Sequence, residues 1–222
     1  MGTARPAKKE NQAPIDHRTL VGRRRRARTE TKILEAALRI FAEKGPDAPV
    51  IDDFIKAAGI ARGTFYNYFK STAELLEATS SWLSDEIAET IEGEVRKLTD
   101  PVVRHCTGMR LWARKAEIDR VSCAFIARVW FNGGFAGYAP LRDIRLGMKT
   151  GGFRCITPQL GFDVSMGAMR QAMLRYMEDP LQKPFGDTLV RTIMQALGVD
   201  SARIDEMMSQ PLPDISWPER QI

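Results

Sequence analysis

Apolar side chains recur every three or four residues in the first third of the chain, which is the spacing of one face of a helix. Within residues 29–44 this stripe predicts a first helix. Gly45 and Pro46 end it, because glycine suits the left-handed cap and proline lacks the amide needed to continue. The same spacing predicts short helices over 51–58 and 62–69. The members of the first stripe are Ile33, Leu34, Ala37, Leu38 and Phe41.

Gly59 separates the two short helices and is the residue expected to take a positive φ angle in a tight turn. Ser71 and Glu74 then have the spacing of a capping box, in which Ser71 begins a long helix. Two short helices that are joined by a glycine turn and follow a supporting helix form the helix-turn-helix pattern. That pattern predicts that the second short helix enters the major groove of DNA. The alternative is a small aromatic helical hairpin.

The second short helix begins with small, polar and basic side chains of the kind that contact base edges. Gly63 permits close approach of the backbone, and Phe65 and Phe69, four residues apart, are expected to anchor the helix in the core. Tyr66 and Tyr68 are expected to direct their hydroxyl groups at phosphates. The residues expected to read bases are Arg62, Gly63, Thr64 and Asn67.

The charge of the chain is concentrated in the same region. The whole net charge of +5 lies within residues 1–78, and its sharpest cluster is the arginine-rich run 23–28. A basic block attached to a neutral remainder indicates that one part of the chain meets a polyanion. We expect residues 1–28 to form a disordered basic arm; the alternative is a solvated tail without a partner. The arginines concerned are Arg23, Arg24, Arg25, Arg26 and Arg28.

The runs 33–45 and 57–69 together strongly resemble the DNA-binding domain of the TetR family of transcriptional regulators. The segments AALRIFAEKG and AGIARGTFYNYF stand at the separation typical of that family, and the resemblance covers about residues 29–78. Thr72 stands where a lysine commonly follows the recognition helix, so Lys70 is expected to take that role. The resemblance implies base reading and phosphate contacts by the residues named above, with the arginine arm along the backbone or in the minor groove.

The segment before the second helix departs from the family pattern. Pro49 and Val50 stand where a capping serine or threonine is usual. Loss of that cap costs about 0.5–2 kcal/mol unless Asp52 or Asp53 compensates at the helix N-terminus. The fold is expected to tolerate the change.

The remainder of the chain stays helical in pattern, broken by glycine and Asp-Pro positions. The resemblance implies an all-α protein in which a long helix joins the three-helix DNA-binding domain to an effector-binding and dimerisation bundle over residues 79–210. The proline-rich residues 211–222 are expected to form a loose tail. The predicted helices of this part are 71–98, 102–115, 120–132, 138–151, 162–178, 185–197 and 201–208.

Two late helices carry apolar stripes that fit a dimer interface. Methionine stripes are more often intramolecular core, but the family resemblance implies that two late helices from each subunit form a four-helix interface. A dimer is also what DNA reading requires, since one short helix contacts only a few base pairs. The candidate interface residues are Met166, Met169, Met173, Met177, Leu189, Val190, Ile193, Met194 and Leu197.

The resemblance places an effector pocket among the middle helices, where several large apolar side chains occur. Such walls suit an apolar or aromatic small molecule, and the alternative for each residue is ordinary core. The candidates are Met109, Trp112, Phe125, Trp130, Phe131, Tyr138 and Met148.

Motifs and composition argue against several other functions. The chain has no GxxxxGK[ST] loop, HExxH or GxSxG motif, so we expect no enzyme. Two histidines and three widely spaced cysteines supply neither a zinc site nor a disulfide framework, and no cofactor is expected. No run reaches 18 apolar residues and no signal peptide is evident, so we expect a cytoplasmic bacterial protein without a membrane partner.

The sequence therefore predicts a homodimeric repressor that binds near-palindromic double-stranded DNA and is released by a small-molecule effector. The alternative is a DNA-binding accessory or architectural protein of the same fold without an effector. A filled helical bundle would favour this alternative, because it leaves no room for a ligand.

Overall fold

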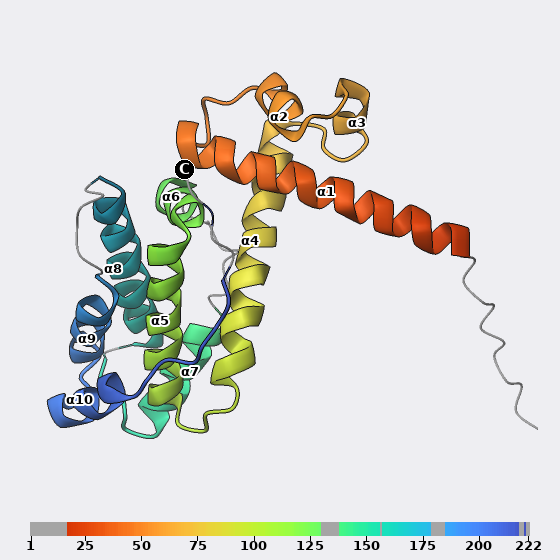
Figure 1. Ribbon diagram of the computed structural model, residues 1–222. Coiled ribbons are helices and arrows are strands. Elements are labelled where there is room, and N and C mark those ends of the chain that lie inside the picture. Colours follow the sequence, from red (N-terminus) through yellow and green to blue (C-terminus); the bar gives the residue numbers. More distant parts are fainter. Residues whose placement is uncertain (1–16, 130–137, 156, 179–184, 218–219, 221–222) are drawn as a thin grey trace, which may run out of the picture.

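Figure 1 shows the computed structural model, in which one long helix joins a small helical group to a larger helical bundle. The structure describes residues 17–129, 138–155, 157–178, 185–217 and 220, and all regular secondary structure within them is helical. No helix of this described part is long and apolar enough to cross a membrane. The helices are α1 (His17–Lys44), α2 (Ile51–Ala58), α3 (Arg62–Tyr66), α4 (Thr72–Val95), α5 (Pro101–Ile118), α6 (Arg120–Val129), α7 (Tyr138–Lys149), α8 (Pro158–Glu178), α9 (Gly186–Ala196) and α10 (Ser201–Ser209).

The helices α1, α2 and α3 form the predicted three-helix group around an aromatic core. Phe41 of α1 packs on Phe54 of α2 with ring centroids 4.9 Å apart, and both side chains are fully buried, as is Phe65 of α3. Gly45 (φ 81°) follows the end of α1, and Gly59 (φ 57°) makes the turn between α2 and α3. Both angles are in the left-handed region that glycine adopts without steric cost, as the sequence predicts.

A side-chain cap begins α4, and a hydrogen bond from the backbone to Asp53 stabilises the start of α2. The Oγ of Ser71 accepts a hydrogen bond from the amide of Glu74 at 3.1 Å, as expected for α4. Val50 offers no side-chain acceptor at the start of α2, and Asp53 compensates by accepting a hydrogen bond from the Val50 amide at 3.0 Å. The Lys44 ammonium, 2.8 Å from Asp53, and the Val50 amide together lower the pKa of the Asp53 carboxyl.

Residues 17–28 are helical and do not belong to the disordered arm that was predicted for residues 1–28, of which residues 1–16 lie outside the described part of the chain. α1 begins at His17 and continues through the arginines as one helix, and this part projects beyond the other helices in Figure 1. The physical reason is that the packed segment 29–44 supplies the helix nucleus. Each further residue then adds one hydrogen bond, and arginine is a good helix former.

The bundle contacts the DNA-binding group through α6 as well as through α4. α5 packs against α4, α7 and α9, while α6 lies between α1 and α8. Arg128 of α6 donates hydrogen bonds to the carbonyl oxygens of Ala42 and Glu43, the second at 2.6 Å. The last carbonyls of a helix lack intrahelical donors, so these bonds cap α1 and tie α6 to it. Phe125 of α6 also packs on Phe41, with centroids 6.2 Å apart.

The described residues after α10 contact the bundle, unlike the loose tail predicted for 211–222, and residues 218, 219, 221 and 222 lie outside the described part. Trp217 is buried, and Arg220 forms ion pairs with Glu86 of α4 and Asp119 at the corner between α5 and α6. These partners lie 134 and 101 residues away in the sequence. No local pattern reveals such contacts, which is why the proline-rich composition suggested a free tail.

Candidate functional site

The recognition helix α3 buries one face and exposes the other. Phe65 and Phe69 are buried and anchor it, as predicted. The helix ends at Tyr66, three residues before the expected end, and Asn67 is its C-cap. Tyr66 is 48% exposed, so its hydroxyl is free to reach a DNA phosphate. The other exposed residues of this face are Arg62, Gly63 and Asn67, with Thr64 half-buried.

A groove of about 450 Å³ separates this face from the arginine-rich part of α1. Arg26 donates a hydrogen bond to the carbonyl oxygen of Asn67 at 3.4 Å, and its guanidinium carbon lies 5.0 Å from the centroid of the Tyr68 ring. The Tyr68 hydroxyl donates to the Arg26 carbonyl at 3.3 Å, so it faces α1. Arginines beside polar groups suit phosphate binding. The groove is lined by Gly22, Arg25, Arg26, Thr29, Thr64, Asn67 and Tyr68.

Several predicted DNA contacts lie outside this groove. Arg23 and Arg24 are exposed, but the turn of about 100° per residue directs them away from the face of α1 that lines the groove. The Lys70 amide donates to the Glu74 carboxylate at 2.6 Å, and Thr72 is the first residue of α4. Gly22 and Thr29 were missed, because the helical periodicity that brings them to the groove was not extended into the basic run.

Arg62 is held by a carboxylate of the preceding helix. Its guanidinium forms an ion pair with Asp52, and the two side chains are 58% and 67% exposed. Solvent screens an exposed ion pair, so the pair contributes little to the stability of the protein. A base edge or a phosphate therefore displaces Asp52 at small cost.

Asp52→Asn is expected to raise the affinity for duplex DNA of any sequence by about 3- to 10-fold, because it removes a negative charge and frees Arg62. The slope of log affinity against log salt should steepen by about one unit for one added phosphate contact. Fluorescence anisotropy with a labelled random duplex measures both quantities. Asp205→Asn, at the exposed pair with Arg191, is the matched control and should change neither. Equal affinities of Asp52→Asn and wild type would contradict the expectation.

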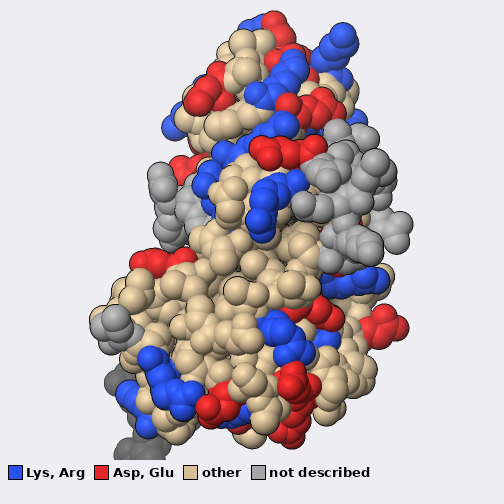
Figure 2. Space-filling model, turned by 90° about the vertical axis from the view of Figure 1, so that its left-hand side faces the viewer, with Lys and Arg blue, Asp and Glu red and all other residues tan. Residues whose placement is uncertain are grey.

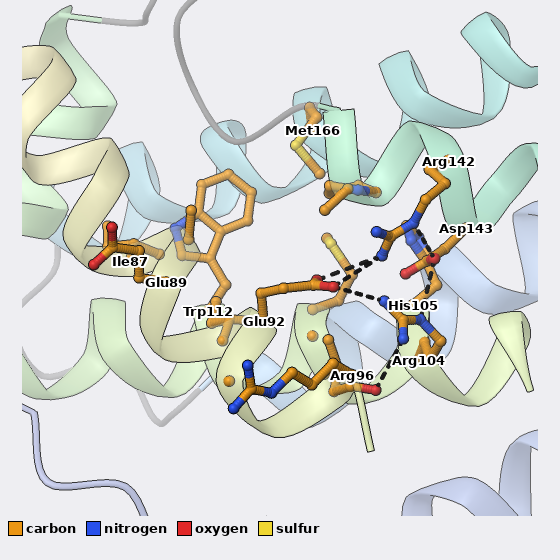
Figure 3. A pocket seen from close by; sticks show the side chains of 18 of the residues that line it. Ile87, Glu89, Glu92, Arg96, Arg104, His105, Trp112, Arg142, Asp143 and Met166 are labelled. Atoms are coloured by element: carbon orange, nitrogen blue, oxygen red, sulfur yellow. Dashed lines mark hydrogen bonds and ion pairs between the residues drawn. The ribbon is translucent and has the colours of Figure 1, made fainter. Parts of the chain in front are cut away.

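A second cavity of about 920 Å³ opens between α4, α5, α7 and α8 (Figure 3). Met109 and Trp112, both predicted pocket residues, line it together with Met166 of α8 and apolar residues of α4 such as Ile87. Its volume is within the range of small-molecule sites. The bundle is therefore not filled.

Four charged residues form a closed set of ion pairs at this cavity. Arg104 of α5 lies 2.9 Å from Glu92 of α4 and 3.2 Å from Asp143 of α7. Arg142 of α7 lies 3.2 Å and 3.1 Å from the same two carboxylates, and Figure 3 shows both guanidinium groups directed at Glu92. Asp143 is 4% exposed and Arg142 is 47% exposed. Arg142 is thus the member most available to a bound molecule.

His105 adds a neutral polar group to the cavity wall. Burial lowers the pKa of His105 to about 4, so the ring is uncharged at neutral pH. Its Nε2 lies 3.2 Å from the Oγ of Ser165, whose hydroxyl donates to the Gly161 carbonyl at 2.8 Å. Because Ser165 uses its proton there, we assign the His105 proton to Nε2. Nδ1 remains as a hydrogen-bond acceptor.

Other predicted pocket residues lie elsewhere. Phe125 is buried at the contact between α6 and α1, and Met148 packs against the core without lining the cavity. Trp130, Phe131 and the side chain of Tyr138 lie outside the described residues. The charged set was missed, because periodicity assigns charges to the surface. In the sequence, the position that could have indicated these buried ion pairs is Asp143, a charged residue that directly precedes the core residue Ile144.

The apolar stripes of α8 and α9 face the core of their own chain, so the predicted dimer residues are corrected. α8 packs on α6, α7 and α9, and α9 packs on α5, which covers both stripes within one subunit. Only Met177 and Leu189 of the predicted set remain half-buried. The buried members are Met166, Met169, Met173, Val190, Ile193, Met194 and Leu197.

Burial keeps two of the three cysteines in the protonated form. Burial raises the pKa of the Cys106 thiol to about 11 and that of Cys123 to about 12, so both stay protonated at neutral pH. No group of three or more His, Cys, Asp or Glu side chains among the described residues could hold a metal ion.

Comparison with known proteins identifies the N-terminal domain. A family model described as bacterial regulatory proteins, tetR family, matches residues 33–79. The uncharacterized HTH-type transcriptional regulator YvdT of Bacillus subtilis (strain 168) is 42% identical over 64 residues, which are 29% of this chain and 33% of that protein. The HTH-type transcriptional regulator CymR of Pseudomonas putida is 39% identical over 70 residues, which are 32% of this chain and 34% of that protein. The matches thus span about a third of these curated relatives.

Solved structures extend the likeness to the bundle. RolR in complex with resorcinol is 25% identical, with a TM-score of 0.64 over 87% of this chain and 100% of that one. FadR from Bacillus subtilis in complex with stearoyl-CoA is 14% identical, with a TM-score of 0.64 over 75% of this chain and 96% of that one, which shows a common fold. Residues 33–79 thus match the tetR family of bacterial regulatory proteins, and the helical bundle that follows them shares the fold of RolR.

Proposed function

We propose that the protein is a homodimeric repressor of transcription in the bacterial cytoplasm, which binds a near-palindromic DNA site and leaves it when a small aromatic effector binds. The observation that carries the proposal is the combination of an exposed recognition helix beside arginines with a ligand-sized cavity in the bundle. α4 connects the two, since it begins after α3 and its Glu92 borders the cavity. An accessory DNA-binding protein without an effector has no need of a cavity of about 920 Å³.

DNA reading is assigned to the exposed face of α3. Arg62 and Asn67 offer hydrogen-bonding groups for base edges, Gly63 lets the backbone approach, and Thr64 lies beside them in the groove. Phosphates are assigned to Tyr66 and to the arginines of the groove, Arg25 and Arg26.

Dimerisation is assigned to the outward face of α8 and α9. Figure 2 shows a broad uncharged area on the side of the molecule where α8, α9 and α10 lie. Depletion of charged residues is typical of the core of a protein interface. Two subunits place two recognition helices on half-sites about 34–36 Å apart, one turn of DNA. Exposed residues at helical spacing on these two helices are Gly167 and Gln171 on α8 and Thr188, Thr192 and Ala196 on α9.

The cavity suits an aromatic molecule with hydroxyl or carboxylate substituents. Trp112 and Met109 provide an apolar wall, while Arg142 and the carboxylates beside it provide donors and acceptors at the other side. The similarity to RolR bound to resorcinol, an aromatic ring with two hydroxyl groups, supports this class of effector.

Release is assigned to a change in the orientation of α4. A ligand that contacts Arg142 competes with Glu92 for the same guanidinium, which loosens the link between α7 and α4. Tilting α4 changes the separation of the two recognition helices. The effector acts only through its different affinities for the two states. Operator DNA must therefore weaken effector binding by the same factor by which the effector weakens DNA binding.

Selection of bound sequences from random duplex DNA at about 150 mM salt tests the proposal. We expect enrichment of one near-palindrome with half-sites about one helical turn apart. Enrichment of nothing but A·T-rich sequence would favour the accessory DNA-binding protein. Titration of effector into free and operator-bound protein then tests reciprocity, and equal effector affinities would contradict the release mechanism.

Arg142→Met is expected to weaken binding of resorcinol by about 10- to 100-fold, because a hydrogen bond to a charged group contributes about 1.5–3 kcal/mol. Isothermal titration calorimetry with resorcinol, and with benzoate and cyclohexanol for comparison, measures the effect. Arg154→Met, which removes the same charge at an exposed pair with Asp200, is the control and should bind as wild type does. Equal binding by both variants would contradict the assignment of Arg142.

A further inference from the structure

The residues that follow α10 run across the outside of α5 toward α4, as the dark blue trace in Figure 1 shows. Arg110 of α5 holds the start of this segment by donating a hydrogen bond to the carbonyl oxygen of Gln210 at 2.9 Å. Trp217 is only 8% exposed, so the segment buries a large side chain. Residues 211–217 together with Arg220 are called the tail strap below.

Arg220 joins two elements that are far apart in the sequence. Its guanidinium lies 2.7 Å from the Glu86 carboxylate of α4 and 2.7 Å from the Asp119 carboxylate at the corner between α5 and α6. The same group lies 5.4 Å from the ring of Trp82, one turn earlier on α4. The Arg220 carbonyl accepts a hydrogen bond from the Val121 amide at the start of α6, at 3.3 Å. One residue thus ties α4 to the α5–α6 corner.

A fully buried cation lies beneath the tail strap. Lys115 of α5 is 0% exposed, and its Nζ lies 2.9 Å from Glu86 and 3.0 Å from Asp119. The ring centroid of Trp217 lies 5.1 Å from the same nitrogen. A buried charge is costly unless it is paired, and Lys115 with Arg220 balances the two carboxylates. Removing the Arg220 guanidinium leaves this group with an excess negative charge.

We propose that Arg220 is a positioning residue, through which the tail strap fixes the middle of α4 against the α5–α6 corner and so sets the orientation of the DNA-binding helices. α4 begins after the recognition helix, and α6 contacts α1 through Arg128. The strap therefore joins the two elements on which the DNA-binding helices rest. The effect on DNA rests on the proposed function; the effect on α4 does not.

The tail strap and the effector cavity act on neighbouring turns of α4. Glu86 and Glu92 are six residues apart, about 9 Å along the helix. The cluster around Glu86 includes the fully buried Lys115 and Asp119, whereas Arg142 at Glu92 is 47% exposed. In this arrangement the tail strap holds α4 in place at Glu86. A ligand in the cavity therefore displaces the part of α4 around Glu92, and Glu86 is the fixed point of that movement.

Arg220→Met removes the guanidinium and keeps a long side chain, while Arg220→Lys is the conservative rescue. Hydrogen–deuterium exchange of the DNA-free protein, followed by mass spectrometry, is expected to accelerate about tenfold in peptides covering 82–92 and 119–124 of the methionine variant. Peptides of α8 to α10 should exchange as in wild type, and Arg220→Lys should exchange close to wild type throughout. Arg154→Met, which breaks the exposed pair with Asp200, is the matched control without an effect on either region.

A double variant distinguishes the loss of the tie between the tail strap and α4 from the loss of charge balance around Lys115. Glu86→Gln with Arg220→Met leaves Lys115 and Asp119 as a neutral pair, so the thermal midpoint should recover most of its loss. Exchange in 82–92 should nevertheless remain fast, because the tie to the strap is still missing. Full recovery of slow exchange in the double variant, or uniform acceleration across the whole chain in Arg220→Met, overturns the proposal.

Binding to the selected DNA site gives the second readout. Lengthening the spacer between half-sites by one base pair should weaken wild-type binding, and Arg220→Met should reduce this discrimination by about tenfold because a loosened α4 tolerates both spacings. An unchanged ratio of affinities overturns the link from the strap to DNA. If the selection enriches no near-palindrome, only the proposed function is contradicted. Hydrogen–deuterium exchange of the DNA-free protein still tests whether the tail strap fixes α4.

Discussion

Gly63→Leu is expected to abolish specific DNA binding while the protein stays folded. Gly63 is exposed on α3, and a Cβ at this position meets no heavy atom within 4 Å, so the fold accommodates a side chain. Replacing glycine within a helix stabilises it by up to about 1 kcal/mol. The leucine side chain occupies the space into which a base pair must come, so the affinity for the selected site should fall by more than about 100-fold.

Fluorescence anisotropy with the selected duplex measures the loss, and urea unfolding measures stability. Ala202→Leu is the control, because Ala202 is an exposed helical residue of α10 and lies outside both the DNA-binding helices and the cavity. That variant should bind DNA as wild type does in the absence of effector. Retention of tight, specific binding by Gly63→Leu would mean that α3 approaches DNA by another face.

Phe41→Ala is expected to lower the free energy of unfolding by about 3–5 kcal/mol. Phe41 is fully buried where three helices meet, with its ring 4.9 Å from Phe54 of α2 and 6.2 Å from Phe125 of α6. Its removal leaves a cavity that these neighbours cannot close, since each is held by its own helix. A loss of this size is a large part of the stability of a typical domain.

Urea denaturation followed by far-ultraviolet circular dichroism measures this loss. Phe41→Leu, which retains most of the apolar volume, should cost about 1–2 kcal/mol. Leu146→Ala, at a residue 44% exposed on α7, should cost less than about 1 kcal/mol. A loss below about 1 kcal/mol for Phe41→Ala would show that the three helices do not depend on this contact.

The start of the recognition domain could be predicted well because its signals are local. The helix over 51–58 has the predicted ends, since Gly59 takes the left-handed angle that the turn needs. Ser71 caps α4 through the Glu74 amide, as its spacing indicated. Phe65 is buried and Gly63 exposed, which follows from the 3.6-residue period.

The groove beside the recognition helix could be predicted only in part. Residue types predicted Arg26 and Asn67 as DNA contacts, but did not predict that Arg26 lies beside Asn67. That arrangement depends on the helical state of the basic run. Local composition favoured a disordered arm, because the packing of 29–44 that supports the helix is not visible at Arg23–Arg28 itself.

Helical periodicity alone thus determined the all-α class, the turn at Gly59 and the exposed face of α3, because each depends on residues within one or two turns of a helix. Tertiary structure decided against which element each apolar face packs. The stripe with Met169 is buried within its own chain, because α6 and α7 pack against α8. It also decided the charges. Asp143 and Arg220 look like surface residues in the sequence, and only partners 39 to 134 residues away make them part of the interior.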